Sequence, residues 1–337
     1  MPGLIRSLPV TVGILFASVV SSPACGRASP EPPPIIKAQM ARPADFAWLR
    51  GGFAEATPEE KQNYAAALKW LDACRAANRQ RILAKLEAMG ISDPERGNGW
   101  SASGICGAMA ERPSIDIYSD YAEFSATVKS TRAPFDAMLA AIDLAEKYSS
   151  PHSDSLADAL LHRPLAEQVL RNAVAWIDAP PDSPGVPALS DKQKPIFRAL
   201  LFAEIGRRDE TNTTWLKQVV QQQGWPTISR VGKQAAGNAW LLAQHADRDP
   251  AFQLQVLRLM EPLMENGEVS SRHYAYLYDR VMLKLTGTQT YATQVTCKDG
   301  KYIPLPLKDK AAMPDLRRSV GLEPFETYLE YFFTPCS

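Results

Sequence analysis

The sequence has no excess of charge of either sign. Its 37 lysines and arginines balance 37 aspartates and glutamates, and aromatic residues are not interleaved with basic clusters. Nucleic-acid binding depends on a basic surface that neutralises phosphates, and a balanced chain has no such field. We therefore predict that nucleic acid is not a partner.

The usual signatures of metal, redox and covalent chemistry are also missing. The chain contains no C-x-x-C, no H-E-x-x-H and no G-x-S-x-G, which mark zinc or thioredoxin-like sites, zinc proteases and serine hydrolases. His152, His162 and His273 are not spaced to complete a ligand set with His245. We predict no metal and no cofactor, and no activated nucleophile can be named.

Long apolar runs are absent, but the N-terminus has the pattern of an export signal. Arg6 precedes an apolar run over residues 8–20, too short for a membrane helix that needs about 20 residues. Small residues then lead to Ala24 and Cys25. We predict a signal peptide over residues 1–24, followed either by simple cleavage or by lipidation of Cys25 as a membrane tether. No transmembrane helix is predicted after the signal, so the expected location is the periplasm or the cell envelope.

The five cysteines suit an oxidising compartment. If Cys25 is lipidated, four remain, and an even number is typical of disulfide-bonded exported proteins. Four cysteines allow three pairings, and the pairs Cys74–Cys106 and Cys297–Cys336 keep each bridge within one predicted domain. The alternative is that the cysteines are buried free thiols.

Proline and glycine divide the rest of the chain into helical segments. Residues 25–45 are proline-rich and are predicted to form a flexible linker. Residues 46–178 show helical spacing, and Thr57 with Glu60 can form a capping box at the first helix. Residues 179–190 are rich in proline and are predicted to link two domains.

Residues 191–337 are predicted to form a helical bundle with one small β-hairpin. The hairpin is centred on Asp299-Gly300, a pair typical of tight two-residue turns. The fold class is therefore mostly α, with two helical domains. The helices expected in the second domain cover residues 192–207, 211–223, 229–246, 249–266 and 270–285, and the two strands cover 293–297 and 301–303.

Four phrases stand out in the C-terminal half: Gly224-Trp225-Pro226, Gln244-His245-Ala246-Asp247, Tyr276-Leu277-Tyr278-Asp279-Arg280, and Gln289-Thr290-Tyr291-Ala292-Thr293-Gln294. They resemble the ordered GWP, QHAD, YxYLxDR and QxYGTQ motifs of a bacterial family of unknown function, over roughly residues 198–294. The resemblance implies where a site lies and names no reaction. One position departs, since Ala292 stands where the family has glycine. If that glycine adopts a positive φ, Ala292 is strained.

Three motif residues suit acid–base chemistry. His245 titrates near neutral pH and is the candidate general base. Asp279 is the candidate partner that orients its imidazole, and Arg280 is the candidate group for binding a carboxylate or phosphate. The structural alternatives are a histidine that satisfies a helix C-terminus and an ion-pair network that fixes helix packing.

The remaining motif residues are candidates for ligand binding. Gln289, Tyr291 and Gln294 fall in a predicted loop, and their polar groups suit a neutral ligand such as a sugar or peptide. They can equally satisfy backbone groups of neighbouring helices. Trp225 either stacks against a ligand or packs in the hydrophobic core. Gln244 is a candidate because it is adjacent to His245 in the sequence.

Two functions from different classes follow. The first is an exported envelope protein, with or without a lipid anchor, that binds a small polar ligand or a partner through a cleft in the C-terminal domain. The second is an envelope hydrolase or transferase that uses His245 and Asp279 as an acid–base pair. The missing nucleophile, metal and cofactor signatures favour the first.

Overall fold

The computed structural model describes residues 30–39, 46–91, 93, 104–149, 153, 155–180, 182–332 and 336. The predicted signal peptide and Cys25 lie outside the described residues. Part of the predicted flexible linker is described and forms a short helix, α1, which buries Ile36.

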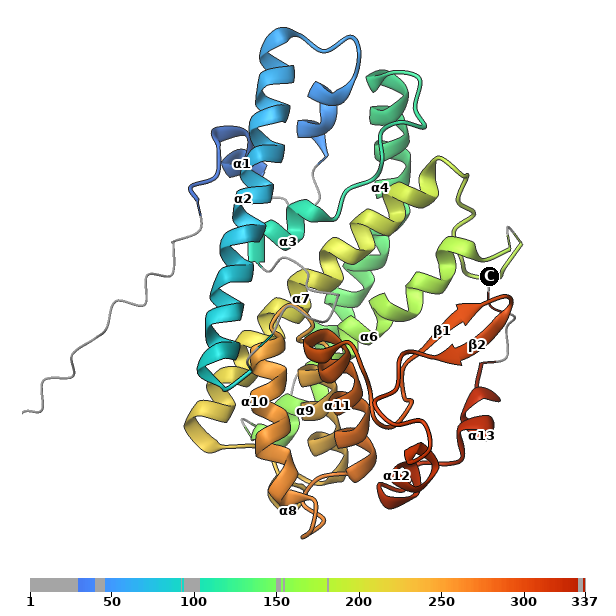
Figure 1. The fold of residues 1–337 in the computed structure, drawn as a ribbon. Coiled ribbons are helices and arrows are strands. Elements are labelled where there is room, and N and C mark those ends of the chain that lie inside the picture. Colours follow the sequence, from blue (N-terminus) through green and yellow to red (C-terminus); the bar gives the residue numbers. More distant parts are fainter. Residues whose placement is uncertain are drawn as a thin grey trace, which may run out of the picture.

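The protein is mostly helical with one two-stranded antiparallel sheet, as predicted (Figure 1). The helix α2 runs along one side of the molecule, α7 crosses its middle, and α9, α10 and α11 gather at the lower end. None of the helices in the described part combines the length and apolar character that a bilayer crossing requires. The elements are α1 (Pro34–Gln39), the 3-10 helix η1 (Ala47–Gly52), α2 (Pro58–Ala88), α3 (Gly104–Ala110), α4 (Tyr121–Tyr148), α5 (Leu156–His162), α6 (Pro164–Asn172), the 3-10 helix η2 (Ala173–Asp178), α7 (Gln193–Gln223), α8 (Ile228–Val231), α9 (Lys233–Gln244), α10 (Pro250–Met260), the 3-10 helix η3 (Glu261–Leu263), α11 (Ser271–Thr286), β1 (Val295–Lys298), β2 (Lys301–Pro304), α12 (Met313–Ser319) and α13 (Phe325–Leu329).

Local signals in the sequence set several of these boundaries. The capping box at α2 is formed: Glu60 N donates to the Thr57 hydroxyl at 3.2 Å, and Thr57 N donates to the Glu60 carboxylate at 2.9 Å. The Asp299-Gly300 turn has positive φ at both residues, which defines the tight turn that joins β1 to β2. Gly232, also at positive φ, divides the expected helix 229–246 into α8 and α9.

The helix α7 is longer than expected, because it joins the two predicted helices 192–207 and 211–223. No proline or glycine separates them, and Glu204 forms ion pairs with Arg207 and Arg208 one turn further along. The long helix contributes to the two larger hydrophobic clusters of the described residues. One cluster includes Leu200 with η1, α2, α3, α4 and α6, and the other includes Leu216 with α5, α9, α10, α11 and the end of α2. The domain boundary at residues 179–190 stays a prediction.

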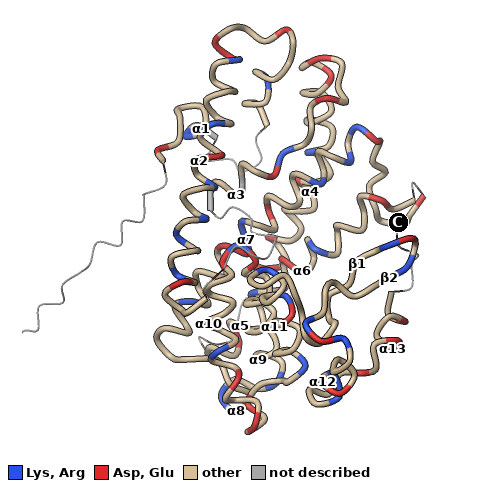
Figure 2. Tube along the Cα trace, viewed as in Figure 1, with Lys and Arg blue, Asp and Glu red and all other residues tan. Residues whose placement is uncertain are grey.

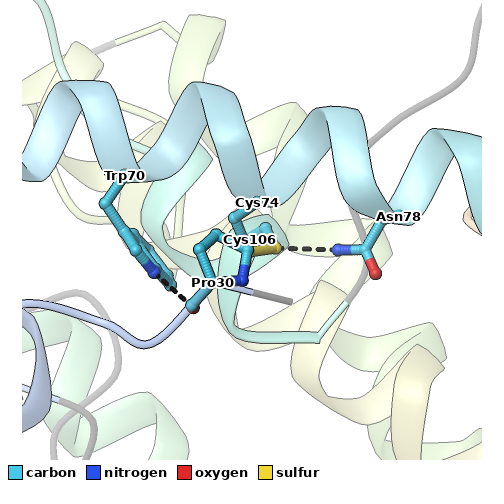
Figure 3. Close-up of a disulfide and its surroundings, with 5 residues drawn as sticks. All are labelled: Pro30, Trp70, Cys74, Asn78 and Cys106. Atoms are coloured by element: carbon cyan, nitrogen blue, oxygen red, sulfur yellow. Dashed lines mark hydrogen bonds between the residues drawn. A yellow bond between two sulfur atoms is a disulfide. The ribbon is translucent and has the colours of Figure 1, made fainter. Parts of the chain in front are cut away.

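The cysteines lie at disulfide distance in the predicted pairing. The Cα atoms are 5.9 Å apart for Cys74–Cys106 and 5.6 Å apart for Cys297–Cys336. Figure 3 shows the first pair between α2 and α3, with the Asn78 amide donating to the Cys106 sulfur at 2.8 Å. The bridge joins α3 to the middle of α2.

Candidate functional site

His245 lies where α9 ends and a short connection leads to α10. Its amide donates to the Leu241 carbonyl at 3.0 Å, which closes the last turn of α9. The connection ends at Asp249, whose carboxylate accepts from Phe252 N at 3.0 Å and caps α10, as the sequence predicts for an Asp-Pro start. The backbone at His245 is therefore held between the last turn of α9 and the capped start of α10.

The partner of His245 is Glu167. His245 Nδ1 lies 2.7 Å from Oε1 of Glu167, a fully buried side chain of α6. The other carboxylate oxygen accepts from Asn212 Nδ2 of α7 at 3.0 Å. The expected pairing of His245 with Asp279 is replaced by this one, because α6 packs against both α7 and α9 and brings a different carboxylate to the imidazole.

The hydrogen bond to Glu167 defines the protonation of the pair. A carboxylate only accepts hydrogen bonds, so the imidazole proton is on Nδ1 and Nε2 keeps its lone pair. Burial lowers the pKa of His245, and the charge of Arg171 acts in the same direction. Burial opposes ionisation of Glu167, but the hydrogen bonds from His245 and Asn212 outweigh it and lower its pKa. At neutral pH the pair is a carboxylate and a neutral imidazole.

A second acid, Asp209 of α7, lies beside this pair. Its carboxyl group is held by Arg171 of α6, whose Nη2 is 2.7 and 2.8 Å from the two oxygens. Burial raises the pKa of Asp209 to about 7, and the nearby negative charge of Glu167 adds to the effect against that of Arg171. Near neutral pH, Asp209 is therefore able to hold or release a proton.

A pocket of about 160 Å³ opens beside His245, between α2, α7 and the α9–α10 connection. Its lining carries charges of both signs. Lys217 pairs with Asp249 at 2.6 Å, whereas Arg81 has no ion-pair partner among the described residues. Lys and Arg positions are likewise interspersed with Asp and Glu positions along the described chain (Figure 2). The charged lining residues are Arg81, Lys85, Asp209, Glu210, Lys217, Arg248 and Asp249.

Glu167, Asp209 and His245 are also close enough to share a metal ion, since one ligand atom from each lies within 4.8 Å of the others. The carboxylate oxygens of Asp209 and Glu167 already accept hydrogen bonds from the protein, however. Arg171 takes both oxygens of Asp209, and His245 with Asn212 takes both of Glu167. A guanidinium at this position repels a cation, so the arrangement favours a proton-sharing network.

Arg280, the predicted anion-binding residue, holds a carboxylate of the protein itself. Its Nη1 lies 2.7 Å from Asp247 Oδ2, and Lys284 contacts the other oxygen of Asp247. Lys284 also donates to Gln253 at 3.0 Å, and the Gln253 amide donates to the carbonyls of Ala243 and Gln244 at 3.1 and 3.0 Å. This network ties α11 to the end of α9 and satisfies its carbonyls.

Asp279 is fully buried and organises the loop after α11. It accepts hydrogen bonds from the backbone amides of Thr290, Tyr291 and Thr293 at 2.7–3.1 Å and from the Thr293 hydroxyl at 3.0 Å. Burial raises the pKa of Asp279, and these hydrogen bonds act against the rise. The observed contacts make Asp279 the centre of a loop rather than the neighbour of an imidazole.

The glutamines of the same loop also bond to its backbone. Gln289 is buried, and its amide donates to the carbonyls of Gln294 and Leu305 at 2.8 and 2.9 Å while its oxygen accepts from Gln294 N. The Gln294 side chain donates to the Thr293 hydroxyl at 3.2 Å. These contacts are with the loop and with the segment that follows β2, whereas the predicted alternative is contact with neighbouring helices. A ligand-binding role for the glutamines stays a prediction.

Trp225 and Gln244 lie apart from the His245 pocket lining. Trp225 is buried and lines a different pocket, together with Trp240 and His273. The side-chain oxygen of Gln244 is buried without a hydrogen-bond partner in the described part of the chain.

Ala292 adopts the backbone expected of a glycine. Its φ is 54°, its side chain is fully buried, and its carbonyl accepts from Arg317 at 3.3 Å. The left-handed region disfavours an L residue by about 1–2 kcal/mol. The positive φ at Ala292 is therefore a point of backbone strain.

Ala292→Gly is expected to change the free energy of unfolding by less than about 0.5 kcal/mol, because relief of about 1 kcal/mol of strain offsets the lost methyl burial and the added chain entropy. The matched control is Ala239→Gly, at an equally buried position inside α9. That change relieves no strain and should cost about 2 kcal/mol. Urea denaturation of both variants measures the difference, and equal costs would contradict strain at Ala292.

The residues that the sequence interpretation missed, Glu167, Asp209, Arg171 and Asn212, come from α6 and α7. Glu167 is 78 positions from His245. One local signal was available, since Pro164, Glu167 and Leu170 are spaced three apart and all are buried. A glutamate within an apolar helical stripe indicates a buried carboxylate that needs a partner.

The fold and site define a mostly helical protein with a charged pocket beside a buried carboxylate–imidazole pair. Residues 193–334 match the model of a family of unknown function (DUF6624). No curated protein and no solved structure matches the chain. The matched segment contains His245 and begins with α7, whereas Glu167 and the α2 wall of the pocket lie before it.

Proposed function

We propose that this protein binds a small zwitterionic ligand, of the class of amino acids and short peptides, in the pocket beside His245. The observation that carries the proposal is the convergence of cationic and acidic side chains from α2, α7 and the α9–α10 connection on one pocket. A simple anion would meet Asp209 and Glu210 there, and a simple cation would meet Arg81 and Arg248. A ligand with both charges satisfies both sets.

The size of the pocket supports a small ligand. Drug-sized molecules occupy pockets of about 300–1,000 Å³, whereas this one measures about 160 Å³. Arg81, with no ion-pair partner in the described part, is suited to a ligand carboxylate, because a guanidinium donates two parallel hydrogen bonds to it.

Isothermal titration with single amino acids and dipeptides tests the proposal. At least one of them should bind, and Arg81→Gln should weaken that binding about tenfold or more, since a charge-assisted hydrogen bond contributes about 1.5–3 kcal/mol. Arg75→Gln, an exposed residue on another face of α2, is the matched control and should bind as the parent does. If no probe binds, or Arg81→Gln binds as tightly as the parent, the proposal is wrong.

The location is proposed to be the cell envelope. The N-terminal pattern at residues 1–24 supports export, and the two cysteine pairs at disulfide distance are compatible with an oxidising compartment. Fractionation separates the two forms of export. Cys25→Ser should release the protein from membranes if Cys25 carries a lipid, and should leave a soluble periplasmic fraction unchanged if it does not.

A second candidate, hydrolysis of the bound ligand, is favoured by the Glu167–His245 pair. Glu167 holds the proton on Nδ1, so Nε2 is free to take a proton from water as its oxygen bonds to an amide or ester carbonyl. As the carbon–nitrogen or carbon–oxygen bond breaks, the protonated Asp209 gives its proton to the leaving amine or alcohol. The imidazolium then returns its proton to Asp209, and one water has been consumed.

Glu167→Gln tests this candidate with a dipeptide that binds. A glutamine can donate its amide N–H to Nδ1 and so hold the wrong tautomer, which should reduce hydrolysis at least about a hundredfold while binding persists. The rate should rise with pH as His245 loses its proton, below its usual pKa, and fall again near pH 7 as Asp209 ionises. Binding without turnover in the parent protein would rule out hydrolysis of that dipeptide.

A further inference from the structure

A second pocket, of about 270 Å³, lies at the other end of α9, where the first turn of α9 meets the end of α10 and the start of α11. These helices lie together at the lower end of the molecule (Figure 1). Most of its exposed lining is apolar, from Ile228, Ala236, Met260 and Val269, and Trp225 also contributes. The pocket shares no lining residue with the His245 pocket.

Two stacked rings form one wall. The rings of Trp240 and His273 are 4.0 Å apart and nearly parallel, with 6° between their planes. The indole N–H of Trp240 is buried and has no hydrogen-bond partner among the described residues. Leaving such a donor unpaired is unfavourable, so a ligand that supplies an acceptor to it binds more tightly.

The pocket is also positively polarised. Lys233, the first residue of α9, is exposed and has no ion-pair partner in the described part of the chain. Ser270 caps the 16-residue helix α11 at the same pocket, so the N-terminal ends of two helices meet there. Helix N-termini favour anions. The other cation, Arg272, is already held by Glu323 at 2.8 Å, which leaves Lys233 to bind a ligand.

We propose that this pocket binds an aromatic carboxylate, independently of the His245 pocket. The ring would lie on the apolar floor beside Trp225, the indole N–H of Trp240 would donate to the ligand, and Lys233 would pair with its carboxylate. An apolar floor that offers, among the described residues, one unpaired cation and one unpaired donor excludes a sugar, whose many hydroxyls would remain unsatisfied. The apolar floor also distinguishes this pocket from the His245 pocket, whose lining carries both positive and negative charges.

The probe is phenylacetate, with phenylacetamide as its uncharged counterpart. Binding is followed by the indole N–H signals in ¹H–¹⁵N spectra of protein labelled at its seven tryptophans, with Trp240 assigned by its loss in Trp240→Phe. Phenylacetate should shift the Trp240 signal and bind at least about tenfold more tightly than phenylacetamide, because only the acid pairs with Lys233. Equal affinity of the two probes, or no shift of the Trp240 signal, would overturn the proposal.

Two variants and their controls complete the test. Lys233→Gln should weaken phenylacetate binding several-fold, and Lys233→Arg should restore it. Gly237→Leu should block the pocket, whereas Gly237→Ala should not, because a Cβ at Gly237 would lie 3.4 Å from the His273 ring and is tolerated. Melting curves confirm that each variant is folded. Unchanged binding in folded Lys233→Gln and Gly237→Leu would contradict the site.

Discussion

Replacing Asp279 by alanine is expected to lower the free energy of unfolding by about 3–5 kcal/mol, the usual cost of removing one side of a buried charged network. The carboxylate accepts from three backbone amides and one hydroxyl, and none of these donors has another acceptor in the described structure. The loop 288–294 follows directly on α11 and contains Ala292 at positive φ. Without Asp279, that strained loop loses the group that holds it.

Urea denaturation measures this effect, and two variants calibrate it. Asp279→Asn keeps one acceptor oxygen and should fall between the parent and Asp279→Ala. Asp315→Ala removes an exposed aspartate of α12, with 81% of its side chain accessible, and should change stability by less than about 0.5 kcal/mol. If Asp279→Ala proves as stable as Asp315→Ala, the loop does not depend on the carboxylate.

Removing the Cys74–Cys106 bridge by Cys74→Ser with Cys106→Ser is expected to destabilise the protein by about 3–4 kcal/mol. The two cysteines are 32 positions apart, so the bridge excludes many open conformations of the unfolded chain. The same change leaves the Asn78 amide without the sulfur that it contacts (Figure 3). The chain from Cys74 to Cys106 is then no longer closed into a covalent loop.

Thiol titration and denaturation with and without reductant check this prediction. Unfolded in the absence of reductant, the parent should show neither Cys74 nor Cys106 as a free thiol, and reductant should lower its stability towards that of the double variant. The matched control is Cys297→Ser with Cys336→Ser, whose loop of 39 positions is similar in length. Free thiols and no effect of reductant would support the alternative that the cysteines are buried and unpaired.

The motif residues of the C-terminal part are largely engaged with one another. Asp247 holds Arg280 and Lys284, Asp279 holds the loop after α11, and Gln289 bonds to the backbone on both sides of that loop. These contacts account for the polar residues, because each of them joins helices or loops of the protein to one another. His245 differs, because its Nε2 has no hydrogen-bond partner among the described residues and the side chain lines a pocket.

What the sequence determined by itself was local. Mostly helical structure, the capping box at Thr57, the start of α10 at Asp249 and the Asp299-Gly300 turn all depend on residues within four positions of each other. The backbone conformations and hydrogen bonds that favour these features are already present in a short peptide. The cysteine pairing followed from parity and from the expected limits of each domain.

Only the tertiary structure decided which carboxylate meets His245. Glu167 and Asp279 lie on helices and Asp247 lies in the α9–α10 connection, and spacing along the chain does not rank these three acidic residues as partners. The choice depends on how the apolar faces of α6, α7 and α9 pack, which brings α6 against the end of α9 and leaves Asp279 to the loop after α11. Packing of faces that lie 78 positions apart in the chain is a property of the whole core, and no local pattern encodes it.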